Sequence, residues 1–492
     1  MRLELLPEPD LEFGAGTHVD IRFGLRDYGP ITSDVATAPK NIQVGFVGTQ
    51  ATIQHVRDWM QRCRSGVPET PSKKPKFRPA FPGFGPQSCF RCDWVSDARL
   101  ERAIPPREIA SILMPGTQPS AVRRAVEVFL DASLYLSRNT KADVIVCAPP
   151  IEVFRHLDIE EAAEGDEREH GAVTPRARRA PRTDRRGSSE LDFHDYLKAR
   201  TLTLSCPIQF MRPSTYDDSI REASGTGRKR HLQDPATRAW NFHTALYYKA
   251  GGTPWRLLRK ASNLESCFIG VSFFHTLDRA SVHTSVAQVF NERGEGMILR
   301  GGEASRSKED RQTHLDKPGM QQLVERALAA FENEHHHLPA RAVVHKTSNF
   351  NQEELEGCIA ALDSFRIRHH DLVVVHESDI RVFRSAAYPP LRGTFLDLDT
   401  RHCVLYTRGS IPFYEMYPGL YVPRALQIDA AQTEESLKAI AQEILALTKM
   451  NWNNTQFDSA LPITVRAARQ VGDILKYAGD LENIQSKYAF YM

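Results

Sequence analysis

The run Ser266-Cys-Phe-Ile-Gly-Val-Ser-Phe-Phe274 is apolar and has the length of a buried strand. Two more strand candidates, 285–290 and 297–300, flank a polar turn at 291–296. The hydrophobic period then predicts helices and strands in alternation, over 320–332 (helix), 340–345 (strand), 352–365 (helix) and 371–376 (strand). More strand-like sequence runs to Tyr406, and closing helices are predicted over 433–447 and 463–477. Three strands that can pair antiparallel, followed by helix, strand, helix and strand, is the order of an RNase H-like fold.

Upstream of this region, the sequence predicts a layer of parallel strands and helices. Ile42-Gln-Val-Gly-Phe-Val-Gly48 reads as a buried strand, and a helical pattern follows over 49–63. A second helix is expected over 117–136 and a second short strand over 143–147. Alternating strands and helices favour an α/β architecture. The first 40 residues are rich in Pro and Gly, so extended segments joined by turns are expected there.

One stretch has almost no aliphatic content. The block 160–169 holds six acids and one Arg, and the block 175–187 holds six Arg and one Asp. Such composition is typical of a flexible solvated insertion. A basic arm that contacts nucleic acid is the alternative.

Composition excludes several protein classes. The chain has 492 residues, of which 41% are hydrophobic and 25% charged, so disorder over the whole chain is excluded. No apolar run approaches the ~18 residues of a membrane helix. The acidic start, 1–10, is unlike a secretory signal, and eight scattered cysteines are too few for a disulfide framework. These features predict a soluble cytoplasmic protein with no membrane contact, while the net charge of +2 gives no evidence for nucleic-acid binding.

Basic and amide side chains gather in three short segments. The segments are Phe193-His-Asp-Tyr-Leu-Lys-Ala199, Cys206-Pro-Ile-Gln209 and Ala245-Leu-Tyr-Tyr-Lys-Ala-Gly-Gly-Thr-Pro-Trp-Arg-Leu257. His194 and Lys198 are four residues apart, so they share one face of a helix. Taken singly, each residue is an ordinary surface or capping residue. Two Lys, one His and one amide that converge near a helix end would form an anion site.

Together these segments resemble the MID domain of Argonaute proteins. The resemblance lies in the spacing His-x-x-x-Lys, a Gln about ten residues on, and the later string Tyr-Tyr-Lys-Ala-Gly-Gly-x-Pro-Trp. In that family the four positions bind the 5′-phosphate of a guide strand. The resemblance therefore implies that guide-phosphate role for His194, Lys198, Gln209 and Lys249.

The second half of the chain is similar to the PIWI domain of the same family. Phe268-Ile-Gly-Val-Ser272 stands where the family has Ile-Gly-x-Asp, and Ala342-Val-Val-His-Lys-Thr-Ser348 where it has Arg-Asp-Gly. The segments 447–453 and 461–468 match the closing PIWI segment. The implied fold class is α/β, with a Rossmann-like MID domain and an RNase H-like PIWI domain. The expected division is an N-terminal extension (1–40), a MID domain (41–264, with the charged insertion near 159–190) and a PIWI domain (265–492).

The resemblance also implies a metal ion at the guide phosphate. In Argonautes with a MID site, the C-terminal carboxylate often helps to hold a divalent cation against that phosphate. Here the ligands would be the carboxylate of Met492 and the side chain of Gln209, with Mg²⁺ as the ion. The apolar end Tyr488-Ala-Phe-Tyr-Met492 suits a buried terminus, although packing for stability alone would explain it too.

The nuclease chemistry of the PIWI domain is expected to be absent. RNase H-like nucleases hold two metal ions with carboxylates, and a hydroxyl cannot replace a bridging carboxylate. Ser272 and Thr347 stand at two of the acidic positions. Glu303 could take the second acid's place, but one acid does not hold two metals. An alternative metal pair, Asp397 and Asp399, is better explained as solvated acids at a strand end or turn.

Two weaker signals remain. Cys89-Phe-Arg-Cys92 lacks the second pair that a structural zinc site requires, although His55 and Cys63 are conceivable helpers. His335-His-His337 is expected to cap a helix end.

The short length resembles that of short prokaryotic Argonautes. That resemblance implies an immune recognition subunit that binds a guide RNA and a single-stranded DNA target without slicing. The output would come from a partner with an APAZ domain and a sirtuin-like, TIR or nuclease effector, in a heterodimer that can oligomerise on target binding. Arg256, Arg259 and Lys260 are suggested channel residues. An active target-cleaving nuclease and a scaffold that binds only protein are the rival functions.

Overall fold

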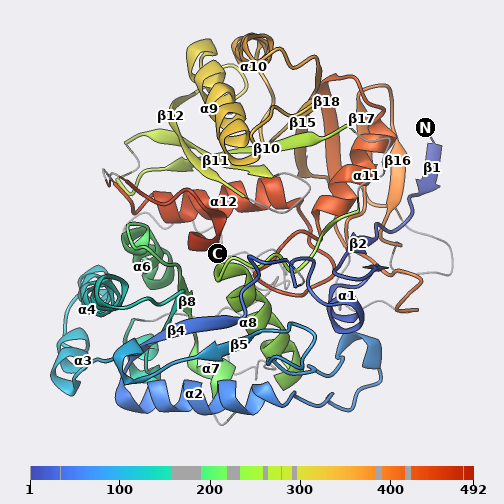
Figure 1. The fold of residues 1–492 in the computed structure, drawn as a ribbon. Helices are drawn as coiled ribbons and strands as arrows, with labels where there is room; N and C mark the ends of the chain where they lie inside the picture. The colour runs from blue at the N-terminus through green and yellow to red at the C-terminus, as the bar shows by residue number, and fades with distance from the viewer. Residues whose placement is uncertain are drawn as a thin grey trace.

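The structure is a computed structural model. It describes residues 2–33, 35–157, 190–218, 233–258, 264–278, 280–290, 296–382, 390–415, 423–479, 481 and 483–492. The two charged blocks, the turn 291–295, and Arg259 and Lys260 lie outside the described residues. Figure 1 shows two units, each built on its own sheet, with helix α12 (Ile463–Leu475) between them. In the described part of the chain, no helix is both long and apolar enough to cross a membrane.

The first unit is a parallel sheet. Its strands follow the order β5-β4-β7-β8, and β6 also pairs with β4. Their bounds are Asn41–Gly48 (β4), Asp93–Val95 (β5), Glu101–Ala103 (β6), Val144–Ala148 (β7) and Ile208–Phe210 (β8). The predicted strands over 42–48 and 143–147 and the predicted parallel pairing are therefore confirmed.

Helices connect these strands, because parallel neighbours require crossovers. Helix α2 begins directly after β4, since the Thr49 side chain accepts a hydrogen bond from the backbone N–H of Thr52. It buries Ile53, Val56 and Met60, as the sequence period predicts. The helix bounds are Gln50–Arg64 (α2), Pro106–Ile112 (α3), Gln118–Asn139 (α4), Ile151–His156 (α5), Phe193–Thr201 (α6), Pro213–Tyr216 (α7) and Pro235–Lys249 (α8).

The second unit is a ten-stranded sheet. Strands β10, β11 and β12 pair antiparallel, and β14 and β15 continue parallel to β10 on its other edge. The bounds are Ser266–His275 (β10), Val282–Phe290 (β11), Ile298–Arg306 (β12), Thr313–His314 (β13), Arg341–Lys346 (β14), His369–Glu377 (β15), Thr394–Asp397 (β16), His402–Leu405 (β17) and Leu426–Thr433 (β18). The predicted RNase H-like order is confirmed.

The helices of the second unit cover both faces of its sheet. Figure 1 shows α9 (Lys317–His335) and α10 (Gln352–Ser364) on one side of β10 and β11, and α12 on the other. The triplet 335–337 lies at the end of α9, as predicted. The prediction of a helix over 433–447 is wrong at its start. Thr433 ends β18, and α11 (Leu437–Leu447) begins only after Ser436, whose side chain accepts from the N–H of Ala439.

Helix α12 and the last residues join the two units into one core. The core cluster of the first unit includes Val471 and Leu475 of α12 together with Phe268 of β10. On the first unit's side, Tyr196 of α6 stacks on Tyr477, just beyond α12, with ring centroids 5.2 Å apart. The packing of α12 therefore sets the position of α6 relative to the ten-stranded sheet.

A second bridge is formed by two sequence segments singled out above. Tyr248, in the string 247–255, stacks on Trp452 with ring centroids 4.9 Å apart. The indole N–H of Trp255 donates to the carbonyl of Lys449, and that of Trp452 donates to the carbonyl of Trp255. The aromatic residues that make these segments recognisable thus fasten one unit to the other.

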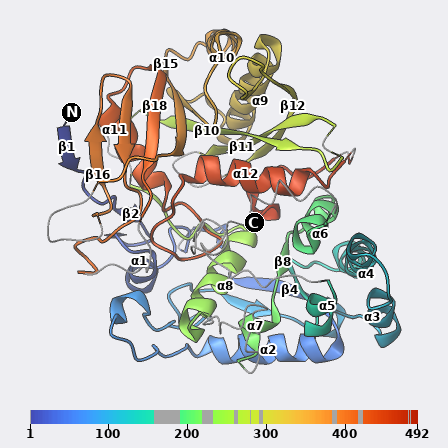
Figure 2. The same ribbon diagram turned by 180° about the vertical axis from the view of Figure 1, so that it is seen from behind.

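The N-terminal segment packs on both units. Strand β1 (Arg2–Leu5) pairs with β16 at the outer edge of the large sheet, as Figure 2 shows. Strand β2 (Leu11–Glu12) pairs with β3 (Thr17–His18) and with β9 (Arg256–Leu257), which follows the first unit.

The prediction of purely extended structure in this segment is wrong, because 21–28 form helix α1. The Asp20 side chain caps it by accepting from two backbone N–H groups, and Gly29 ends it at a φ of 69°. The helix buries Ile21 and Leu25, four residues apart, but its apolar pattern spans only eight residues within a Pro- and Gly-rich segment.

A buried ion cluster holds the N-terminal segment in place. Glu8 lies between Arg392, at 2.9 Å, and Lys449, at 2.9 Å, and both cations are fully buried. Burial alone would raise the pKa of Glu8, but the charges of Arg392 and Lys449 outweigh it and lower the pKa. The ionised carboxylate therefore neutralises two buried cations.

Glu8→Gln is expected to lower the free energy of unfolding by about 3 kcal/mol, because two buried cations lose their counter-ion. Chemical denaturation measures the change. Glu4→Gln is the matched control, since Glu4 pairs with Lys438 at the exposed edge of the same segment. Equal effects of the two variants would show that the cluster does not stabilise the fold.

Candidate functional site

Two lysines from different helices meet at one backbone carbonyl. Lys198 lies in the last turn of α6, and Lys249 is the last residue of α8. Their Nζ atoms lie 3.3 Å and 3.1 Å from the carbonyl oxygen of Ile208 in β8. The lysines are 1% and 5% exposed. The structure thus brings together two buried ammonium groups that the sequence placed about 50 residues apart.

Gln209 and the last residue complete this cluster. The Nζ of Lys249 donates to Oε1 of Gln209 at 2.6 Å and to the main-chain oxygen of Met492 at 3.2 Å. Tyr488, Phe490, Tyr491 and Met492 are all buried, as predicted for the apolar end. Helix α8 ends at this point, where Gly251 takes a φ of 94° that favours glycine. The next position also requires glycine, because a side chain on Gly252 would strike the ring of Tyr247.

His194 stands at the outer side of the cluster. It lies one turn before Lys198 on α6, its ring meets Phe210 edge-on with centroids 5.3 Å apart, and its side chain is 31% exposed. Its Nδ1 is 2.8 Å from the carboxylate of Asp195. All four residues predicted for anion binding therefore lie around the end of β8.

Charge and burial explain what this cluster can bind. Burial lowers the pKa of Lys198 to about 8, because a desolvated ammonium is unfavourable. Lys249 adds a second buried amine beside the same carbonyl. An anion between the two amines would stabilise both charged forms and accept charge-assisted hydrogen bonds. The arrangement suits a compact, highly charged anion such as a phosphate monoester.

A second candidate site lies at the strand ends of the large sheet. Val271 pairs with Lys346 in the parallel register of β10 and β14, so the next residues, Ser272 and Thr347, are neighbours. Both line a cleft of about 890 Å³. Its other lining residues are Phe273, His275, Arg306, Arg311, Gln312, Thr313, Ser348, Asn349, His376, Gln427, Asp429 and Arg469. Asp429 is the one carboxylate among the described lining residues.

The other acids considered from the sequence do not line this cleft. Glu303 is exposed on β12, opposite His283. Asp397 ends β16, and Asp399 accepts hydrogen bonds from the backbone N–H groups of Arg401 and His402. The interpretation of the last two as acids at a strand end and turn is confirmed.

Comparison with known proteins identifies the fold. No protein-family model and no curated protein matches the sequence. Among solved structures, Clostridium butyricum Argonaute, bound to a guide DNA and a 19-mer target DNA, matches with a TM-score of 0.60 and 15% identity, over 98% of this chain and 54% of that one. Drosophila Piwi matches with a TM-score of 0.59 and 12% identity, over 100% of this chain and 56% of that one. Marinitoga piezophila Argonaute, in complex with a 5′-OH guide RNA, matches with a TM-score of 0.54 and 12% identity, over 100% of this chain and 59% of that one.

The fold is that of the MID and PIWI domains of Argonaute proteins. The five-stranded unit has the MID fold and the ten-stranded unit the PIWI fold, and the two units are named accordingly below. The chain spans a little over half the length of these structures. The lysine cluster belongs to the MID domain, and the cleft lies at the strand ends of the PIWI domain.

Two further sequence candidates, Arg256 and the Cys89–Cys92 pair, lie among the described residues. Arg256, suggested for the nucleic-acid channel, forms a two-pronged ion pair with Glu12. Cys89 and Cys92 are free thiols, and burial raises the pKa of each to about 12. Among the described residues, the group that brings three possible ligand atoms within 4.8 Å of one another is Asp192, His194 and Asp195, beside the MID site.

Sequence reasoning missed the basic lining of the PIWI cleft. Arg306, Arg311 and Arg469 come from β12, the turn after it and α12. Arginines in a surface hairpin and on a helix have no spacing pattern of their own. The one available signal was the presence of Ser272 and Thr347 where the family resemblance expects acids, which predicts a cleft without a metal pair.

Phosphate binding at the MID site is expected to weaken as the pH rises above about 8. The Lys198 ammonium attracts the anion, is present below its pKa and is lost above it. Bound phosphate raises the pKa of Lys198. Phosphate affinity therefore falls by up to about tenfold per pH unit once the pH exceeds the Lys198 pKa of the unliganded protein. Titration of a 5′-phosphorylated oligonucleotide measures this, with a 5′-hydroxyl oligonucleotide as control. A flat profile for the phosphorylated strand would show that Lys198 does not contact it.

Proposed function

We propose that the chain is a guide-directed nucleic-acid-recognition protein. Its MID domain holds the 5′-phosphate of a guide, and its PIWI domain holds the guide–target duplex without cutting it. The observation that carries this proposal is the convergence of His194, Lys198, Gln209 and Lys249 around the end of β8. The structural neighbours support it, because Clostridium butyricum Argonaute is bound to a guide and a target.

The depth of the site favours a terminal phosphate. Lys198 and Lys249 are almost fully buried, and the buried segment ending at Met492 lies against Lys249. An internal phosphodiester carries chain on both sides, which hinders its approach to groups buried this deeply. A terminal phosphate carries chain on one side and has an extra negative charge, which two ammonium groups stabilise. Marinitoga piezophila Argonaute, with its 5′-OH guide, indicates that the fold alone does not impose a phosphate.

The same pocket offers oxygen ligands for Mg²⁺. Oε1 of Gln209 and the main-chain oxygen of Met492 both contact the Nζ of Lys249, so a cationic group already lies between them. Amide and carboxylate oxygens are the ligands that a hard cation prefers. In this proposal, Gln209 and Met492 would hold Mg²⁺, which would neutralise part of the charge of the guide phosphate.

The double variant Lys198→Met plus Lys249→Met is expected to bind a 5′-phosphorylated guide about 100-fold more weakly, since hydrogen bonds to charged groups contribute about 1.5–3 kcal/mol each. Filter binding and analysis of co-purified nucleic acid measure the loss. Lys317→Met is the matched control, because Lys317 is an exposed lysine in an ion pair with Glu356. Undiminished guide binding by the double variant would rule out this site. A preparation of the wild type with no affinity for any strand would favour the protein-only scaffold.

The proposal that the chain does not slice rests on the PIWI cleft. Ser272 and Thr347 offer hydroxyls where two-metal nucleases need carboxylates, and Asp429 is the one acid among the described lining residues. The guide-loaded chain is therefore expected to leave a complementary target intact in Mg²⁺ and in Mn²⁺. Gel analysis of a labelled target tests this. Site-specific cleavage that Asp429→Asn abolishes would establish the rival nuclease function.

A recognition protein that does not cut requires an output. By the sequence resemblance to short prokaryotic Argonautes, we extend the proposal to an immune role. In it the chain takes RNA guides against single-stranded DNA and pairs with an APAZ-domain effector of the sirtuin-like, TIR or nuclease kind. Co-purification with the product of a neighbouring gene is the direct test.

A further inference from the structure

The PIWI cleft has the charge pattern of an anion site rather than of a metal site. Three arginines and two histidines line it, against one carboxylate among the described lining residues. A two-metal centre requires the opposite balance, because acids must neutralise the ions. Loss of the acids has therefore left a cleft whose local potential attracts negative groups even though the whole chain is nearly neutral.

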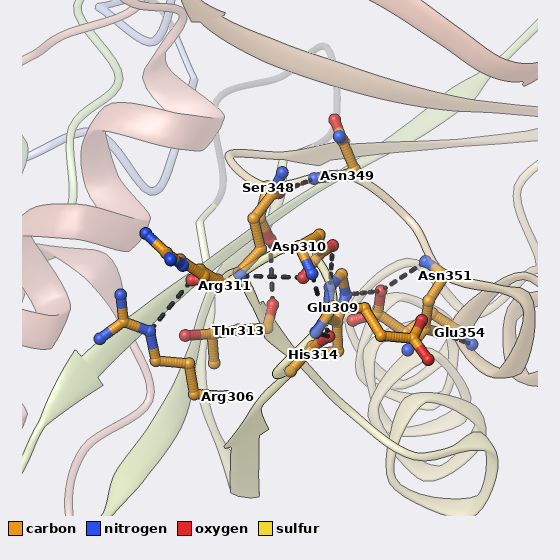
Figure 3. Close-up of polar contacts among 12 residues, drawn as sticks. Arg306, Glu309, Asp310, Arg311, Thr313, His314, Ser348, Asn349, Asn351 and Glu354 are labelled. Carbon is orange, nitrogen blue, oxygen red and sulfur yellow. Dashed lines mark hydrogen bonds and ion pairs between the residues drawn. The ribbon is translucent and has the colours of Figure 1, made fainter.

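Two of the arginines come from one hairpin. Strands β12 and β13 pair through Ser305–His314 and Arg306–Thr313, and the turn 307–312 joins them. The backbone N–H of Ser307 donates to the carbonyl of Gln312 at 2.8 Å, and Nε of Arg306 donates to the carbonyl of Arg311 at 3.0 Å. Figure 3 shows the side chains of Arg306 and Arg311 extending to the same side, away from Glu354.

A buried chain of polar groups fixes the base of this hairpin. Lys346 donates to Glu354 at 2.6 Å. Glu354 contacts one ring nitrogen of His314, and Asp310 contacts the other at 2.8 Å, as Figure 3 shows. Lys346 and Glu354 are fully buried and His314 nearly so. The network ties the turn to the end of β14 and the start of α10, which holds the hairpin rigid.

Contacts to the loop that follows β14 add to this support. The backbone N–H of Asn349 donates to the side chain of Gln312 at 2.7 Å, and Ser348 donates to the carbonyl of Thr313 at 3.1 Å. Arg311 itself has a φ of 59°, an unfavourable conformation that the surrounding contacts impose. The hairpin therefore presents its arginines from a fixed position rather than from a loose loop.

The two guanidinium groups remain available for a ligand. Both arginines are exposed, and neither forms an ion pair with another described residue. The neighbouring acid, Asp310, is already used by His314 and by the N–H of Gln312. Guanidinium groups match phosphate geometry with two parallel hydrogen bonds. Arg469, on α12, brings a third guanidinium to the same cleft.

We infer that this cleft binds a phosphate group directly through Arg306 and Arg311, assisted by Arg469, without a divalent metal. The phosphate is an internal phosphodiester of the target strand. The arginines bind it where a two-metal nuclease would hold its ions, but they do not cleave it. A free nucleotide has the same chemistry and is the other source to be distinguished. The inference rests on the proposed function for its ligand, but its residues are separate from the MID site.

Arg306→Gln plus Arg311→Gln tests it, with Arg366→Gln plus Arg368→Gln as the matched control. The control arginines are exposed on the PIWI domain outside the cleft, and Arg366 has the same kind of backbone, with a φ of 58°. The probe is a preformed RNA–DNA hybrid with a 5′-hydroxyl guide strand, which does not depend on loading or on the MID phosphate site. The cleft variant is expected to bind at least about tenfold more weakly, with a salt dependence lower by about two ion equivalents.

Three further measurements make the outcome decisive. The gap between wild type and cleft variant is expected to persist in EDTA, and its disappearance there would overturn the metal-free clamp. Equal losses of hybrid affinity in the cleft and control variants would also overturn it, because the positive charge of any exposed arginine pair would then explain the binding. A cleft variant that loses ADP binding but keeps hybrid binding would overturn the target-strand assignment. Binding of a single 5′-phosphorylated guide, measured in parallel, reports on the proposed function alone and is expected to be equal in all variants.

Discussion

The packing of α12 between the two sheets is the constraint on which both candidate sites depend. One side of this helix contacts β10 and β11, and its end meets α6, which carries His194 and Lys198. The chain then continues to Met492, beside Lys249. A single amphipathic helix therefore holds the MID site and one wall of the PIWI cleft in fixed positions relative to each other.

The charges are arranged in two different ways. In the MID site, two lysines are buried and poorly solvated, so they gain most from a small, highly charged group that enters completely. In the PIWI cleft, the arginines are exposed on a braced hairpin, so they can contact a backbone that passes across the surface. Buried clusters such as Glu8 with Arg392 and Lys449 serve neither site and hold the N-terminal segment.

Much of the fold could be predicted because its strands and helices have strong periods. The strand 266–274, the helix over 352–365 and the parallel strands of the MID domain needed only apolar patterning. Strand β18 was not predicted, although it pairs with β15 and β17 inside the sheet, because its apolar–polar alternation over 426–430 is too short to specify a strand alone. Helix α1 was missed because its apolar pattern spans only eight residues within a Pro- and Gly-rich segment.

The sequence by itself determined which chemical groups are present: two lysines, an imidazole and an amide in a recognisable order, and hydroxyls at two positions of the PIWI strands. Only the tertiary structure decided how these groups meet. Lys198 and Lys249 share a carbonyl because two helices end beside one strand, and Arg256 is occupied by Glu12 from the far end of the chain. The arginine cleft arises in the same way, since its members come from β12, a turn and α12. Spacing along a chain specifies local geometry, but the contacts between distant segments follow from packing, which no short pattern encodes.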